Sequence, residues 1–152
     1  MAQHWPKSAG PNYVPAYQVS GVPYVTSSLQ NLGANGSLST TVKQVDFPYA
    51  TRFFFVENHG PVPMRVGFTE NGVNGKGSGD VSNYFIVAAS GSSPRLEIRC
   101  KSLFLRAEYA KTAFSITAGL SGVDAGDFPV LTGTMSGSHS SHQGHPYFSG
   151  VG

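Results

Sequence analysis

The sequence predicts an all-β fold, a single eight-stranded jelly-roll sandwich with an extended N-terminal arm and a flexible C-terminal tail. Three observations predict it. About eight short runs between Tyr24 and Leu120 have strand character, turn residues separate them at regular spacing, and no helical stretch interrupts them. A half-buried strand alternates apolar and polar residues, whereas a helix repeats every 3.6 residues, so the side-chain period distinguishes the two.

The expected strands follow from that period. Alternation is clearest in three segments, whose apolar members share one face: Met64, Val66 and Phe68; Leu96, Ile98 and Cys100; Phe114, Ile116, Ala118 and Leu120. Further strands are expected at 23–29, 37–46, 51–57, 83–89 and 101–108, where β-branched and aromatic residues dominate. Gly, Pro, Asn and Ser separate the runs, as at 33–36 and 90–94.

The chain divides into three parts. Its 152 residues are expected to form one domain with a core of its own. Residues 1–22 form a proline-broken arm, 23–122 the jelly-roll domain, and 123–152 a C-terminal segment with a flexible Gly/Ser/His-rich tail. Trp5, Tyr13 and Tyr17 on the arm are the candidate interaction residues, because such side chains need a groove on the same sandwich or on an adjacent subunit.

Charged residues are scarce. Asp, Glu, Lys and Arg make up 12% of the chain, against about 25% in an ordinary domain. Interfaces are depleted in charge and enriched in aromatic residues, which here are also 12%. Composition therefore favours an assembly subunit, and leaves open a neutral monomer coated with Ser, Thr and Asn.

The net charge of +2 is too small to indicate nucleic-acid binding. The closest basic group is interrupted by Glu97 and Glu108, and charges on solvated strand edges explain it better. Its members are Arg95, Arg99, Lys101 and Arg106.

No targeting or membrane segment is expected. Residues 1–20 lack the basic region and apolar run of a signal peptide, and no stretch approaches the ~18 apolar residues of a membrane span. Cys100 is the single cysteine, so no internal disulfide is expected and the thiol is interpreted as core filling.

The tail contains a candidate metal site. His139, His142 and His145 recur every third residue, and imidazoles can chelate a transition metal. Only Gly, Ser and Gln surround them, with no carboxylate to hold them in place, so a solvated low-complexity tail is favoured. The paired His-containing strands of a cupin are missing, since His59 stands alone in an expected turn. We expect no cofactor.

Catalytic motifs are not evident. The Gly-rich stretch 72–80 lacks the helix and the Lys-Ser/Thr pair of a phosphate loop, so a surface loop is expected. No serine stands in a Gly-x-Ser-x-Gly elbow, and the spacing of the carboxylates pairs none of them for glycoside hydrolysis. The sequence therefore predicts no catalytic residue and no enzyme.

Several short sequence segments within about residues 13–122 carry a family resemblance. They resemble the single jelly-roll capsid proteins of large icosahedral double-stranded DNA viruses, in particular the penton, or vertex, proteins of chloroviruses. The segments are Tyr13-Val14-Pro15-Ala16-Tyr17, Gly21-Val22-Pro23-Tyr24-Val25-Thr26-Ser27-Ser28, Arg65-Val66-Gly67-Phe68-Thr69-Glu70-Asn71-Gly72-Val73, Ser102-Leu103-Phe104-Leu105-Arg106 and Phe114-Ser115-Ile116-Thr117-Ala118-Gly119-Leu120-Ser121-Gly122.

The resemblance implies a structural protein made in the host cytoplasm and located in the virion. It implies a homopentamer at each fivefold vertex, with the major and minor capsid proteins as neighbours. Two alternatives stay open: a minor capsid or cement protein of the same virion, and a carbohydrate-binding jelly roll in which Tyr24, Tyr49 or Tyr84 stacks on sugars. A secreted cytokine-like jelly roll is disfavoured because no signal or anchor is seen.

Overall fold

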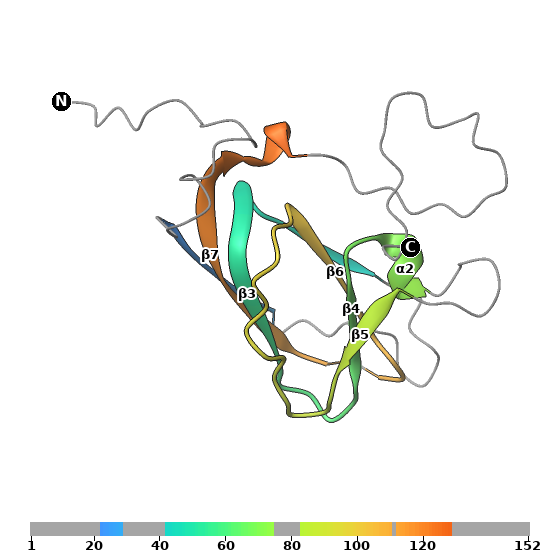
Figure 1. Ribbon diagram of the computed structural model, residues 1–152. Helices are drawn as coiled ribbons and strands as arrows, with labels where there is room; N and C mark the ends of the chain where they lie inside the picture. The colour runs from blue at the N-terminus through green and yellow to red at the C-terminus, as the bar shows by residue number, and fades with distance from the viewer. Residues whose placement is uncertain (1–21, 29–41, 75–82, 111, 129–152) are drawn as a thin grey trace, which may run out of the picture.

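The computed structural model describes residues 22–28, 42–74, 83–110 and 112–128. Two antiparallel sheets make up most of this part of the chain (Figure 1), which confirms the all-β prediction. The three-stranded sheet has the order β1 (Val22–Ser28), β7 (Phe114–Asp124), β3 (Tyr49–Asn58). The four-stranded sheet has the order β2 (Lys43–Asp46), β6 (Ser102–Ala107), β4 (Met64–Gly67), β5 (Tyr84–Val87).

The core lies between the two sheets. The apolar members of β7, from Phe114 to Leu120, are at most 2% exposed, as their alternation predicted. They pack in one cluster with the inward residues of the other strands, which include Phe54, Val56, Met64, Val66, Leu103 and Leu105. Burial of this continuous apolar surface is the main force that holds the sheets together.

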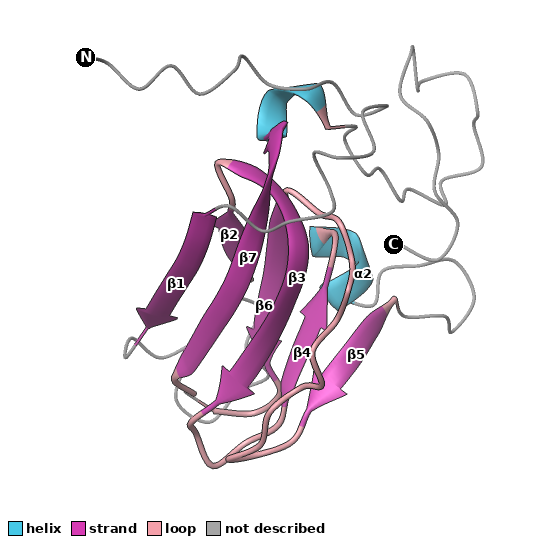
Figure 2. Cartoon of the chain, turned by 60° about the vertical axis from the view of Figure 1, so that its left-hand side comes forward, coloured by secondary structure: helices cyan, strands magenta, loops and turns pink. Residues whose placement is uncertain are grey.

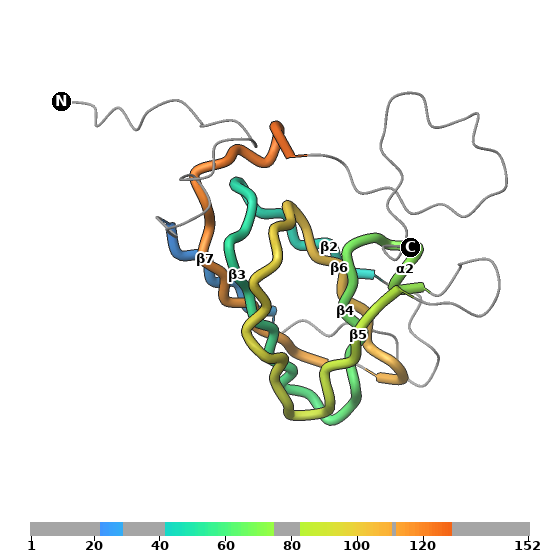
Figure 3. Tube along the Cα trace, in the orientation of Figure 1, coloured from blue at the N-terminus to red at the C-terminus, as the bar shows by residue number. Residues whose placement is uncertain are grey.

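The prediction of a regular strand over 96–100 is wrong. This segment runs beside the edge of β3 (Figure 3), but it makes isolated bridges and single backbone hydrogen bonds, such as the Phe54–Leu96 bridge, in place of a continuous ladder. Pro94 has no N–H to donate to a ladder, and side chains take over part of the backbone pairing. The Ser93 hydroxyl accepts from the Val56 N–H (2.9 Å), and the Thr51 hydroxyl accepts from the Cys100 N–H (2.9 Å).

A second difference from the sequence prediction is a short helix. The sequence predicts no helix, yet α2 (Glu70–Asn74) occupies the start of the expected 72–80 loop. The Thr69 hydroxyl caps it by accepting from the Gly72 N–H at 3.0 Å. Val73 is fully buried, and a Cβ on Gly67 would lie 2.7 Å from its side chain, so this glycine is needed for the close approach. The remainder of the 72–80 loop, from residue 75, lies outside the described residues.

The ends of the strands also differ from the expected bounds. The expected 37–46 strand is described only as β2, because residues 29–41 lie outside the described part. β7 continues to Asp124, and a 3-10 turn, η1 (Ala125–Asp127), follows it. Phe128 then packs against Ala50 and Val123.

The sandwich has two opposite flanks (Figure 2). β1 and β2 meet on one flank, where the Tyr24 ring packs edge-on against Phe47 at 5.0 Å. β5 and the edge of β3 lie on the other flank. The sheet order thus places the two sheet edges far from each other.

Candidate interaction surfaces

The flank that β1 forms carries exposed aliphatic side chains. Within the described residues β1 pairs only with β7, so its outer edge is open. Val25 is 67% exposed on the outer face of β1, whereas Tyr24 and Thr26 turn toward the sandwich; Val22 shares their face at the start of the strand but is still 40% exposed. An open strand edge with apolar side chains is a site for association with another chain. We call Val22, Val25 and this edge the β1 flank.

The opposite flank carries two exposed isoleucines, one near each end of β3. Ile86 on β5 is 59% exposed, and Ile98 on the segment beside β3 is 38% exposed. In the part of the chain that the structure covers, β5 pairs only with β4, so a second sheet edge is open here. We call Ile86, Ile98 and this edge the β5 flank.

Charges near the β5 flank are paired with one another. Arg95 lies 2.8 Å from Glu97, and Arg52 lies 3.7 Å from the same carboxylate. The Arg95 guanidinium also stacks over the Phe53 ring at 3.8 Å. Exposed pairs of this kind add little stability, typically 0–1 kcal/mol. Each of these charges therefore has a partner of opposite sign close to Ile98 in the sequence.

The interpretation of the basic group as charges on solvated edges is wrong for Arg106. This side chain is 8% exposed and donates to the Oδ1 of Asn74 at 3.2 Å and to its backbone oxygen at 3.4 Å. Lys101 likewise has a local acceptor, the Phe128 carbonyl oxygen at 3.3 Å. The basic residues therefore serve separate local contacts.

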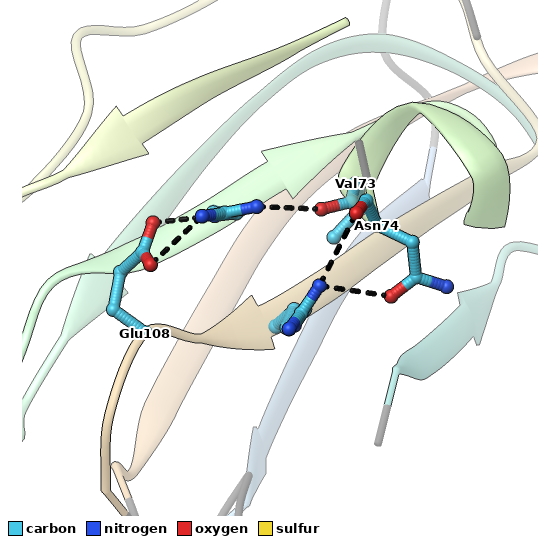
Figure 4. Close-up of polar contacts among 5 residues, drawn as sticks. Val73, Asn74 and Glu108 are labelled. Atoms are coloured by element: carbon cyan, nitrogen blue, oxygen red, sulfur yellow. Dashed lines mark hydrogen bonds and ion pairs between the residues drawn. The ribbon is translucent and has the colours of Figure 1, made fainter. Parts of the chain in front are cut away.

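Arg65 and Glu108 form a second ordered charge site, under α2 (Figure 4). Arg65 donates two hydrogen bonds to the Glu108 carboxylate, from Nε to Oε1 and from Nη2 to Oε2, the second at 2.9 Å. The hydrogen bond with Glu108 is the main reason that the pKa of Arg65 is raised. The same guanidinium lies 4.5 Å above the Tyr84 ring and donates to the Val73 carbonyl oxygen at 3.4 Å.

Two arginines thus hold the end of α2 on the outer face of the four-stranded sheet. Arg65 binds the carbonyl of Val73 and Arg106 that of Asn74, the last residues of the helix. Cations are favourable at a helix C-terminus, where carbonyl groups lack helical partners. The site therefore fixes where the chain leaves the sheet surface at Asn74.

An outer pocket of about 600 Å3 lies over β2 and β6, between the start of α2 and η1. Leu103 and Leu105 point into the core, so Ser102 and Phe104, which alternate with them, face this pocket. Phe47 and Phe68 add apolar wall, and Asp46 and Glu70 add carboxylates. The pocket is a half-open hollow with both apolar and acidic side chains in its lining.

Glu57, His59 and Ser115 form a surface cluster with the residue types of a hydrolase. The Ser115 hydroxyl donates to the Glu57 carboxylate at 2.8 Å, and the His59 Nε2 lies 2.8 Å from the same hydroxyl oxygen. The serine proton therefore points to the carboxylate and not to the imidazole. A nucleophilic serine needs the opposite arrangement, with the imidazole as its base, so this cluster ties β3 to β7.

The tyrosines considered for sugar stacking are mostly engaged. Tyr24 packs on Phe47, and its hydroxyl lies 3.4 Å from the Asp46 carbonyl oxygen. Tyr84 is covered by the Arg65 guanidinium. Tyr49 is 37% exposed. These three rings form no shared platform, since each belongs to a different strand and two have partners.

Several predicted sites lie outside the described residues: Trp5, Tyr13, Tyr17, His139, His142 and His145. Among the residues that the structure describes, no three His, Cys, Asp or Glu side chains gather as a metal site. Cys100 is 1% exposed, and burial raises the pKa of its thiol to about 12. This agrees with its interpretation as core filling, although it lies outside a regular strand.

Sequence reasoning did not identify the residues of the two flanks: it placed Ile98 on an inward face with Leu96 and Cys100, whereas Ile98 is 38% exposed. It also missed the Arg65–Glu108 pair. A signal for Ile86 was available, because it alternates with the buried Val87 and must face outward. No sequence signal pairs Arg65 with Glu108, which stand 43 positions apart.

Comparisons with known proteins found no relative of this chain. No family model matches the chain, and neither the curated proteins nor the solved structures contain a match. Across the described residues, no helix has the length and apolar character needed to cross a membrane.

Proposed function

We propose that this chain is a structural subunit of an icosahedral double-stranded DNA virus capsid and forms the homopentameric penton at the fivefold vertices. It acts by shape and burial, without turnover of a substrate. One observation carries the proposal: among the described residues, each of two opposite flanks has a sheet edge without a strand partner and carries exposed aliphatic side chains. The family resemblance of the sequence supplies the viral setting.

Opposite flanks are what a ring of identical subunits requires. A closed ring of identical subunits is built from heterologous contacts, in which one flank of each subunit meets the other flank of the next. The β1 flank offers Val22 and Val25, and the β5 flank offers Ile86 and Ile98. Exposed apolar side chains on both sides support such a contact, because they would lose their water against the facing flank.

The topology supports a jelly roll as the finer description of the fold. The orders β1-β7-β3 and β2-β6-β4-β5 leave one place beside β3, and the bridged segment around Ser92 and Leu96 occupies it. With that segment counted as an irregular eighth strand, each sheet has four members.

The partners follow from the vertex position. The subunit contacts other copies of itself through the two flanks, and its outer surfaces meet the major and minor capsid proteins. The low charge content of 12% fits a subunit that is surrounded by protein.

Lysine substitutions, one on each flank, test the head-to-tail arrangement. Val25→Lys and Ile86→Lys each place a charge in the contact, so each variant alone is expected to be monomeric at concentrations where the wild type forms a ring. Mixed in equal amounts, the two variants still have one intact flank each and should form dimers that grow no further. Tyr109→Lys is the control, since Tyr109 is 61% exposed but lies after β6, outside the strands whose edges form the two flanks.

Two outcomes would overturn the proposal. A symmetric contact between two β1 flanks would leave Ile86→Lys as associated as the wild type. A carbohydrate-binding module would stay monomeric in all forms and bind sugars on a glycan array.

A further inference from the structure

The outer pocket over β2 and β6 has a defined chemistry. Phe68 and Phe104 give it apolar walls, and Asp46 and Glu70 give it two carboxylates. Lys101 is the basic residue of the lining, and its ammonium group donates to the Phe128 carbonyl oxygen at 3.3 Å. A suitable occupant is therefore an aromatic side chain with a cation close to it.

The chain enters β1 beside this pocket. Tyr24, two residues after the strand begins, packs on Phe47 and places its hydroxyl 3.4 Å from the carbonyl oxygen of Asp46. Both Phe47 and Asp46 line the pocket. Val22 pairs with Leu120, at the end of β7 that leads into η1, and Ala125 and Gly126 of η1 also line the pocket. The segment that precedes Val22 thus joins the sandwich close to the pocket.

Residues 1–21 contain a sequence that fits the pocket. Trp5-Pro6-Lys7 joins an aromatic side chain to the single Lys or Arg of this segment, which has no Asp or Glu at all. The segment between Trp5 and Val22 can span up to roughly 60 Å when extended, so it is long enough to return to the pocket. Attachment to the same chain also raises the effective concentration of the arm at the pocket.

We propose that the outer pocket is the binding site of this chain's own N-terminal arm, with Trp5 between the phenylalanine walls and Lys7 at the carboxylate of Glu70. The arm then covers the outer face of β2 and β6. This inference does not depend on the proposed capsid function, because it requires only one copy of the chain.

Trp5 is the single tryptophan of the protein, so its fluorescence reports directly on this contact. In the full chain we expect an emission maximum shifted to the blue of the unfolded chain in urea, and a lower acrylamide quenching constant. Phe104→Ala should reduce both differences, since it removes an apolar wall without touching the core. Lys7→Glu should also reduce them, and the exchanged pair Lys7→Glu with Glu70→Lys should restore them. Glu97→Gln, on the β5 flank, is the control and should change neither. Circular dichroism confirms that each variant is folded.

The contrary results are specific. If Trp5 in the folded wild type is quenched as strongly as in the unfolded chain, the arm does not occupy a pocket. Trp5 lies elsewhere if its protection survives Phe104→Ala. The same holds if the exchange of Lys7 and Glu70 does not restore the protection that Lys7→Glu removes. Protection that disappears on dilution shows that the arm binds a neighbouring copy and overturns binding within one chain.

Discussion

The Asn58 side chain accepts a hydrogen bond from the Thr112 hydroxyl at 2.5 Å, joining the end of β3 to the segment before β7. Its oxygen also accepts from the Gly60 N–H at 3.0 Å, and its amide nitrogen donates to the carbonyl oxygens of Val62 (2.7 Å) and Ala88 (3.0 Å). One side chain, 1% exposed, therefore ties three loop segments together at one end of the sandwich.

Asn58→Ala is expected to lower the free energy of unfolding by about 3 kcal/mol or more. It leaves several buried polar groups without partners, and each such group costs about 1–3 kcal/mol. Thr112→Val removes one of these contacts and should cost about 1 kcal/mol. Urea denaturation of the two variants measures both values. A loss below about 1 kcal/mol for Asn58→Ala would mean that the loops hold together without it.

Removal of either partner of the Arg65–Glu108 pair should be costly. Arg65→Met or Glu108→Leu leaves one charge in a site where the two side chains are only 17% and 10% exposed, and such a loss is typically about 3–5 kcal/mol. The double variant should recover much of that loss, because no bare charge remains.

Thermal or urea unfolding of the two single variants and the double variant tests the pair. Additive losses in the double variant would contradict the account, since they would show that the two charges do not interact.

The Cys100 thiol should make stability fall at alkaline pH. Burial raises its pKa from 9.0 to about 12 in the folded protein. The unfolded chain therefore loses this proton first, and between these two pH values the free energy of unfolding falls by at most about 1.4 kcal/mol per pH unit. Below about pH 9 both states keep the proton, so the thiol adds no pH dependence there.

Cys100→Ala provides the comparison for that prediction. It removes the thiol but leaves the other titrating groups, so the difference in unfolding free energy between wild type and variant should shrink as the pH rises above about 9. Parallel pH profiles for the two proteins would show that the thiol is not buried as described. The native thiol should also react with iodoacetamide far more slowly than the thiol of the unfolded chain.

The sequence predicts the core strands well, because a strand that buries one face must alternate. The inward faces of β4 and β7 follow directly from Met64, Val66 and the run from Phe114 to Leu120. Phe68 is a partial exception, since it is half-buried and packs against the core from its side.

The same reasoning fails where side chains replace backbone pairing or where a tertiary contact overrides propensity. Leu96, Ile98 and Cys100 alternate, but Ser93 and Thr51 take up hydrogen bonds that a ladder would have made. Gly72 disfavours a helix, yet the burial of Val73 and the arginine contacts at its end stabilise α2. Both effects depend on residues far away in sequence.

The flanks illustrate a different limit. Alternation shows that Ile86 faces away from the core, but only the sheet order reveals that it and Val25 stand on opposite sides of one sandwich. That relation between two distant strands is what a ring contact depends on.

The mass of the protein in solution tests the central claim most directly. Native mass spectrometry or sedimentation at micromolar concentration should give a closed species five times the 16.0 kDa of one chain, with dimers and trimers only as minor intermediates. A stable 16.0 kDa monomer that does not grow with concentration would contradict the account.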